Sequence, residues 1–198
     1  MRSGSDAKIA RTDDPRAERT RAALLHAAVD VVQEQGTSDL SLTEIAKAAG
    51  VSRQAAYLRY RDLGELLLDA AIELLRSEVG PPTPGENPRA ATLRMTEHFA
   101  RHRDFYRAML SGRSAYALHL RILQLLHPSA PENVKALETA PARDLGAFVT
   151  GGAGTIINSW VLDPDDDSTP EQLADRIDTV LDLLASGILL PHPQTSTP

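Results

Sequence analysis

Apolar residues recur at helical spacing along most of the chain, and no segment alternates apolar and polar residues long enough to predict a strand. The stretch GPPTPGENP at 80–88 holds four prolines and two glycines, which cannot continue a helix. The expected helices lie near 15–35, 42–49, 53–59, from Asp62 to the break at 80–88, and near 88–102, 104–111, 113–127, 143–161 and 169–190. The fold class is therefore all-α, with about nine helices.

The same pattern divides the chain into four parts. Residues 1–13 are polar and unpatterned, which predicts a flexible N-terminal arm. An N-terminal helical domain is expected at 14–62 and a larger C-terminal helical domain at 63–190. The tail at 191–198 is rich in Pro, Thr and Ser, and this composition predicts disorder.

The segment LSLTEIAKAAGVSRQAAYLRYRD meets the physical requirements of a helix-turn-helix. Ser41 and Glu44 can form a capping box at the start of the first short helix. Ala46 is small where two helices must cross closely, Gly50 permits the tight turn, and Val51 fills the space between the helices. The coincidence of these features favours DNA binding over two ordinary short helices.

Exposed polar side chains would then line the second helix, whose N-terminal part enters the major groove of double-stranded DNA. Arg53 can donate two hydrogen bonds to guanine, and Gln54 can pair with adenine. Hydroxyl groups and further basic or aromatic side chains suit phosphate contacts beside the groove. The residues predicted to contact DNA are Thr43, Ser52, Arg53, Gln54, Tyr57, Tyr60 and Arg61.

Residues 16–70, including TRAALLHAAVDVVQEQG and ELLLDA, resemble the DNA-binding domain of the tetracycline-repressor (TetR) family. The resemblance implies a homodimeric repressor that binds a pseudo-palindromic operator and is released by a small-molecule effector bound in the C-terminal domain. Two positions depart from the family pattern. Tyr60 stands where the family usually has phenylalanine, and Leu63 stands where it often has a lysine that meets a DNA phosphate.

Most aromatic and histidine residues of the C-terminal domain gather between 98 and 119. An apolar cavity with a few polar groups is the usual form of a small-molecule site. Each of these side chains, taken alone, is more simply explained as core. With the family resemblance, the cluster predicts an effector pocket, for which the candidate residues are His98, His102, Phe105, Tyr106, Met109, Tyr116 and Phe148.

Three neighbouring glycines in GGAGTIINSW, at 151–160, would weaken an isolated helix and are best tolerated where another backbone approaches closely. The last predicted helix carries a clean apolar stripe. By the family resemblance, the helices near 143–161 and 169–190 would form a four-helix bundle at the homodimer interface.

Metal and cofactor sites are not predicted. His98 and His102 have metal-ligand spacing, but Phe99 breaks the metalloprotease pattern and no third ligand is evident. The acidic run DPDDD at 163–167 lacks the glycine and glutamate of a calcium loop, so a solvated turn capped by Asp167 or Ser168 is expected. No nucleophile–base pair or cofactor loop supports an enzyme.

Charge and composition refine the prediction. The formal net charge is −6, but it divides into about +2 for residues 1–61 and about −8 for the remainder. Cysteine is absent, and neither a membrane helix nor a secretory signal is predicted, so a cytoplasmic protein is expected. Two alternatives stay open: a helical small-molecule-binding protein or enzyme that has lost DNA function, and a helical interaction module that forms heterodimers.

Overall fold

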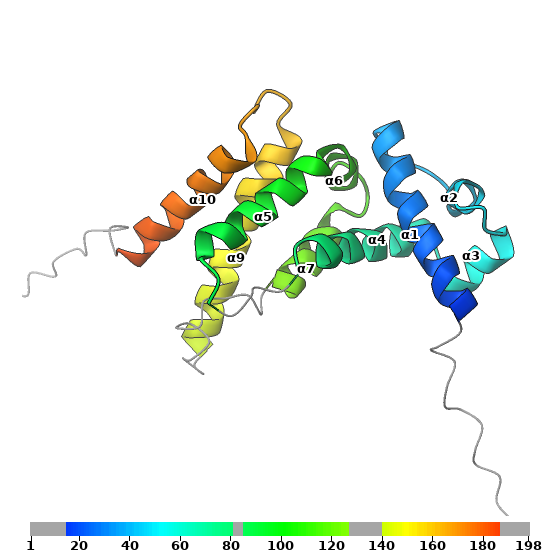
Figure 1. The fold of residues 1–198 in the computed structure, drawn as a ribbon, viewed down its shortest axis with the longest axis horizontal. Coiled ribbons are helices and arrows are strands. Elements are labelled where there is room, and N and C mark those ends of the chain that lie inside the picture. The colour runs from blue at the N-terminus through cyan, green and yellow to red at the C-terminus, as the bar shows by residue number, and fades with distance from the viewer. Residues whose placement is uncertain (1–14, 81–84, 127–139, 187–198) are drawn as a thin grey trace, which may run out of the picture.

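The computed structural model describes residues 15–80, 85–126 and 140–186, and these ranges contain helices and no strand. The predicted arm at 1–13 and tail at 191–198 lie outside them. Figure 1 shows an elongated arrangement, with α1–α3 at one end and α10 toward the other. The helices are α1 (Pro15–Gln35), α2 (Leu42–Ala48), α3 (Arg53–Arg59), α4 (Leu63–Glu78), α5 (Pro88–Arg101), α6 (Arg103–Leu110), α7 (Ala115–Leu126), α9 (Ala140–Leu162) and α10 (Pro170–Ala185).

Helices α1–α3 form a small head around one apolar cluster. α1 packs against α2, α3 and α4, and α2 packs against α3. Leu24, Ala28, Leu42, Ile45 and Ala56 are all buried where these helices meet. Their spacing on each helix is the helical repeat of the sequence, so burial of one face per helix explains the arrangement.

Helices α5, α6, α7, α9 and α10 form a larger body, and α4 joins it to the head. α4 packs against α1 on one side and against α7 on the other. α5 lies along α10, which Figure 1 shows side by side, and α6 packs against both α1 and α9. The sequence-based boundary between 62 and 63 stays a prediction, since α4 shares its buried face with both parts.

A second contact between the head and the body lies where α6 packs against the loop that follows α1. The Ser38 hydroxyl donates to the Ala108 carbonyl at 3.0 Å. A Cβ atom added at Gly112 would collide with Ser38 Oγ and lie 3.2 Å from the same carbonyl. A larger residue at position 112 would therefore have to displace the Ser38 side chain and break its hydrogen bond to Ala108.

The helix boundaries confirm the all-α prediction and differ from it in detail. Ser41, Ser52 and Asp62 cap α2, α3 and α4 as their side-chain chemistry predicts. The cap of α10 is Thr169, which forms a capping box with Gln172, and not Asp167 or Ser168. Thr169 is the cap because the Gln172 side chain, three residues later, accepts a hydrogen bond from the Thr169 backbone N–H.

Candidate nucleic-acid interface

The helix-turn-helix is fixed by local hydrogen bonds and burial. The Ser41 hydroxyl accepts from the Glu44 N–H at 3.2 Å, and Glu44 Oε2 accepts from the Ser41 N–H at 2.7 Å. Gly50 has a φ of 65°, the left-handed region that favours glycine. The Val51 N–H then donates to the Ala46 carbonyl at 2.9 Å and closes the turn. The orientation of α3 relative to α2 is therefore fixed.

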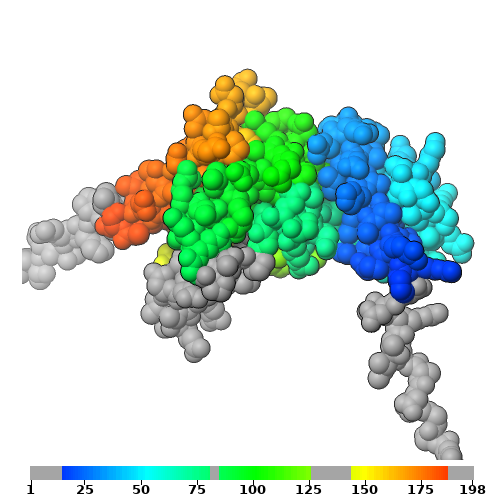
Figure 2. Space-filling model, in the orientation of Figure 1, coloured from blue at the N-terminus to red at the C-terminus, as the bar shows by residue number. Residues whose placement is uncertain are grey.

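Three side chains predicted to read DNA lie together on the exposed face of α3. Arg53, Gln54 and Tyr57 line one open hollow of about 470 Å³. The Arg53 guanidinium lies 5.4 Å from the centre of the Tyr57 ring, which orients the arginine by a cation–π contact. Figures 1 and 2 place α3, in cyan, at the end of the molecule away from α9 and α10.

The remaining predicted contacts border this face. Thr43 is half-buried at the start of α2, and Ser52 is exposed while its hydroxyl accepts from the Ala55 N–H. Arg61 is exposed, and its Nε donates to Glu65 Oε2 at 3.1 Å. An exposed pair of this kind is worth little energy, so Arg61 can exchange Glu65 for a phosphate.

Tyr60 does not belong to the exposed face, and its predicted contact with the DNA backbone does not fit the structure. The side chain is buried, with 5% of the residue exposed, and its hydroxyl donates to Asp69 Oδ2 at 2.7 Å. Arg21 also donates to both oxygens of Asp69, at 3.1 and 3.2 Å. Burial raises the pKa of Tyr60 well above its usual value, and the hydrogen bond to Asp69 adds to the shift.

This polar cluster ties three helices together and was missed by sequence reasoning. Arg21 on α1 also donates to Glu73 on α4 at 3.2 Å, while Tyr60 follows directly after α3. A tyrosine in place of the usual phenylalanine was the signal that could have found it, because a buried hydroxyl needs a partner. Leu63 lies next to the cluster in sequence and packs, partly buried, against the apolar core.

The seven residues predicted to line an effector pocket separate into four buried, two exposed and one half-buried. His98, Phe105, Tyr106 and Met109 are fully buried and belong to the core of the body, with the Phe105 and Tyr106 rings 5.2 Å apart. Burial lowers the pKa of His98 to about 4, so its ring is neutral near pH 7. Tight packing of this kind leaves these four side chains as core residues in the described state.

Tyr116 and Phe148 are, in contrast, exposed by 74% and 65%. They therefore do not line a closed cavity with the buried group. The seventh residue, His102, is half-buried, and its Nε2 lies 2.9 Å from a Glu78 carboxylate oxygen. The structure thus places Glu78 beside His98 and His102. The sequence alone did not single out Glu78.

The helices predicted to form a dimer interface present apolar side chains to the outside. On α9 Leu145, Phe148 and Leu162 are exposed, and on α10 Val180 and Leu183 are exposed. Among the residues that the structure describes, none comes within 4 Å of a Cβ atom added at Gly151 or Gly152, so these leave room at this face of α9 for a second backbone.

Within the described ranges, Asp144–Leu162 is also long and apolar enough to span a membrane, with a mean hydropathy of 1.3 and 22% of it buried. Length and composition do not distinguish such a helix from one that packs against a second chain.

Sequence profiles of known families match both parts of the chain. A profile described as bacterial regulatory proteins, tetR family, matches residues 24–70. A profile described as a transcriptional regulator C-terminal region matches residues 86–183. The chain belongs to the tetR family of bacterial regulatory proteins.

Relatives with curated names match this TetR-family chain over about a third of its length. The HTH-type transcriptional regulator AcrR of Shigella flexneri is 40% identical over 72 residues, which is 36% of this chain and 33% of AcrR. An uncharacterized HTH-type transcriptional regulator of Mycobacterium bovis is 37% identical over 71 residues, or 36% of each chain. The match thus spans about a third of the length of these relatives.

Solved structures share the fold over most of this TetR-family chain. A TetR-family regulator from Syntrophomonas wolfei has a TM-score of 0.65 and 16% identity, covering 87% of this chain and 98% of its own. FadR of Thermus thermophilus, a TetR-family repressor in complex with lauroyl-CoA, has a TM-score of 0.55 and 24% identity, covering 90% and 100%. At these identities the likeness shows the fold.

Proposed function

We propose that the chain is a transcriptional repressor that binds a pseudo-palindromic DNA operator as a homodimer and is released by a small-molecule effector. The observation that carries the proposal is the exposed α3 face, where Arg53, Gln54 and Tyr57 lie together on a rigidly capped helix-turn-helix. Such a regulator acts in the cytoplasm, where the DNA is, and catalysis has no part in the proposal.

Each side chain of the α3 face has a role that follows from its chemistry. Arg53 would donate two hydrogen bonds to O6 and N7 of a guanine, and Gln54 would pair with N6 and N7 of an adenine. Tyr57 holds the guanidinium of Arg53 and would place its own hydroxyl near a phosphate. Thr43, Ser52 and Arg61 would contact phosphates at the edges of the same groove.

Dimerisation would place two such faces on successive major grooves. The exposed apolar side chains of α9 and α10 support an interface formed by these two helices from each chain. Burial of the open face around Gly151 and Gly152 would account for the apolar composition of α9 without a membrane. The interface would form the four-helix bundle expected for the family.

The effector would bind in the body. The fold neighbour FadR holds lauroyl-CoA, which shows that a chain of this fold accommodates a ligand. Because His98, Phe105, Tyr106 and Met109 fill the core here, we propose that a ligand enters by displacing packed side chains of α6. α6 also contacts α1, so a shift of α6 would move the head.

A binding experiment with two arginine variants tests the DNA-binding part of this proposal. Arg53→Ala should weaken binding to a selected operator by about tenfold to a hundredfold, the usual value of a bidentate base contact. Arg121→Ala removes the same charge from an exposed position on α7 and should leave affinity unchanged. Equal losses in the two variants, measured by fluorescence anisotropy at one fixed salt concentration, would contradict base reading by Arg53.

A further inference from the structure

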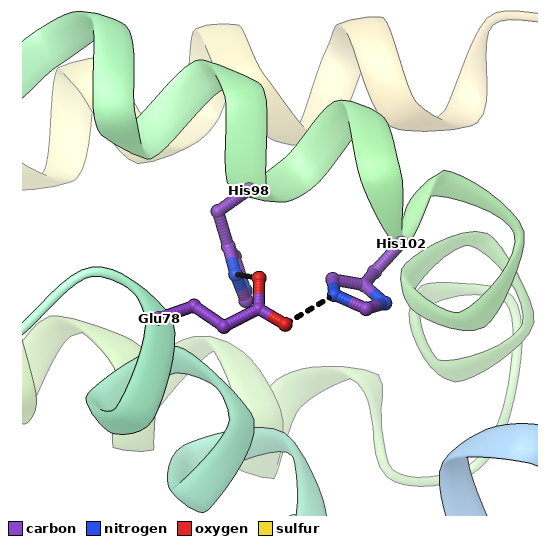
Figure 3. A group of neighbouring side chains, drawn as sticks. All are labelled: Glu78, His98 and His102. Carbon is purple, nitrogen blue, oxygen red and sulfur yellow. Dashed lines mark hydrogen bonds and ion pairs between the residues drawn. The ribbon is translucent and has the colours of Figure 1, made fainter.

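Glu78, His98 and His102 converge where the end of α4 meets the end of α5. Glu78 is the last residue of α4, His98 lies in the last turn of α5, and His102 directly precedes α6. Figure 3 shows the Glu78 carboxylate lying between the two imidazole rings. Its Oε2 lies 3.0 Å from His98 Nδ1, and its Oε1 lies 2.9 Å from His102 Nε2.

Two imidazoles and one carboxylate form a donor set that suits a divalent transition metal, above all zinc. The three ligand atoms all lie within 4.8 Å of one another. Zinc bonds of about 2.1 Å at tetrahedral angles separate neighbouring ligand atoms by about 3.4 Å. The contacts of the carboxylate with the two imidazoles, at 3.0 and 2.9 Å, are slightly shorter than this, so metal binding would need only side-chain adjustments at the three residues.

The surroundings of His98 can accommodate a metal on Nδ1. A metal-bound imidazole donates its other N–H to a second group, which fixes the ring. His98 Nε2 lies 2.8 Å from the Tyr106 hydroxyl, and that hydroxyl lies 3.4 Å from the Ala71 carbonyl. With the proton on Nε2, His98 would donate to Tyr106 and Tyr106 would donate to Ala71, which leaves the Nδ1 lone pair directed at the site.

Among the described residues, Arg101 on α5 also forms an ion pair with the Glu78 carboxylate. Its Nη1 donates to Glu78 Oε2 at 2.5 Å, so it occupies an oxygen that a metal would use. The Arg101 side chain is 59% exposed, against 26% for Glu78 and 13% for His102. An arginine so exposed can move into water at little energetic cost.

We propose that Glu78, His98 and His102 form a binding site for one divalent transition-metal ion such as zinc, with the fourth coordination position left for water. The metal would link the C-terminal end of α4 to the junction of α5 and α6, and α4 itself also packs against α1 of the head. The site is independent of the α3 face and of any operator. Sequence spacing supplied the two histidines, and only the fold supplies Glu78.

Calorimetric titration of the untagged, chelator-treated chain with zinc chloride tests the site, and cobalt(II) chloride gives a parallel visible spectrum of tetrahedral coordination. One ion per chain is expected. Glu78→Gln and His102→Ala should each weaken zinc binding at least about tenfold, because each removes a direct ligand. Arg101→Gln should tighten it, an effect that a merely structural role for the cluster would not produce.

His26→Ala is the matched control, since His26 is an exposed histidine on α1 and its loss should not change zinc affinity. Circular dichroism of each variant checks that it is folded. His102→Ala and Glu78→Gln proteins that are folded and bind zinc as tightly as the parent would overturn the proposal. So would a parent chain that binds no zinc, or an affinity that falls equally in His26→Ala.

Discussion

The head and the body of the molecule place their chemistry in opposite ways. In the head, capped helices bury mainly small and aliphatic side chains, with Tyr60 as the aromatic exception, and leave Arg53, Gln54 and Tyr57 exposed on α3. In the body, aromatic and titratable groups such as His98 and Tyr106 are buried against one another. A ligand can therefore reach the head without any rearrangement, whereas access to the body's core requires its helices to move.

The largest effect should come from truncation of the body's aromatic core. Phe105→Ala should lower the free energy of unfolding by about 3–5 kcal/mol, because the fully buried ring leaves a cavity. Urea denaturation of the parent and the variant measures the difference. If Phe105 instead lined an open effector pocket, its truncation would cost little, and a loss below about 1 kcal/mol would contradict the core assignment.

The contact between the head and the body at Gly112 should respond next. Gly112→Ala forces a Cβ atom against Ser38 and should cost about 1–3 kcal/mol of stability. Ser38→Ala alone loses the hydrogen bond to Ala108, worth about 1 kcal/mol. In the double variant the clash is removed, so the combined loss should be smaller than the sum. Strict additivity in urea denaturation would show that the loop does not press on Gly112.

Substitutions of Tyr60 and Tyr57 should give the smallest effects, and they distinguish a buried structural residue of the head from an exposed one. Tyr60→Phe should lower stability by about 1 kcal/mol through loss of the hydrogen bond to Asp69, with operator affinity unchanged. Tyr57→Phe, at a ring 45% exposed, should leave stability within about 0.5 kcal/mol of the parent. Thermal denaturation and anisotropy titration measure both quantities. A Tyr60→Phe protein with full stability and weakened operator binding would show that Tyr60 contacts DNA, contrary to this account.

The head could be predicted closely from the sequence because its structure depends on near neighbours. The capping box of Ser41 and Glu44 and the turn at Gly50 each involve residues within a few positions of one another. Helical spacing then decides that Arg53, Gln54 and Tyr57 share one face. Tyr60 could not be placed in this way because its hydrogen-bond partner, Asp69, lies on α4, where Arg21 of α1 also donates to it.

The body was harder to predict because its chemistry depends on contacts between distant segments. Glu78 contacts His98 and His102, which follow it on the other side of the break at 80–88. Residue spacing along a helix cannot predict a contact between two helices. Helical spacing also does not tell a packed core from a ligand cavity, since both need apolar side chains on inward faces. The prediction that the Phe105 and Tyr106 rings line a pocket therefore differs from the described structure, in which they fill the core.

Selection of bound sequences from a random pool of duplex DNA, followed by footprinting, tests the central claim most directly. The purified chain should enrich a pseudo-palindrome whose half-sites are centred about one or more helical turns apart and should protect both. Arg53→Ala should relax the preference at one guanine in each half-site. If the purified, folded chain enriches no sequence and protects no site even at low salt, the assignment of the α3 face to DNA reading is contradicted.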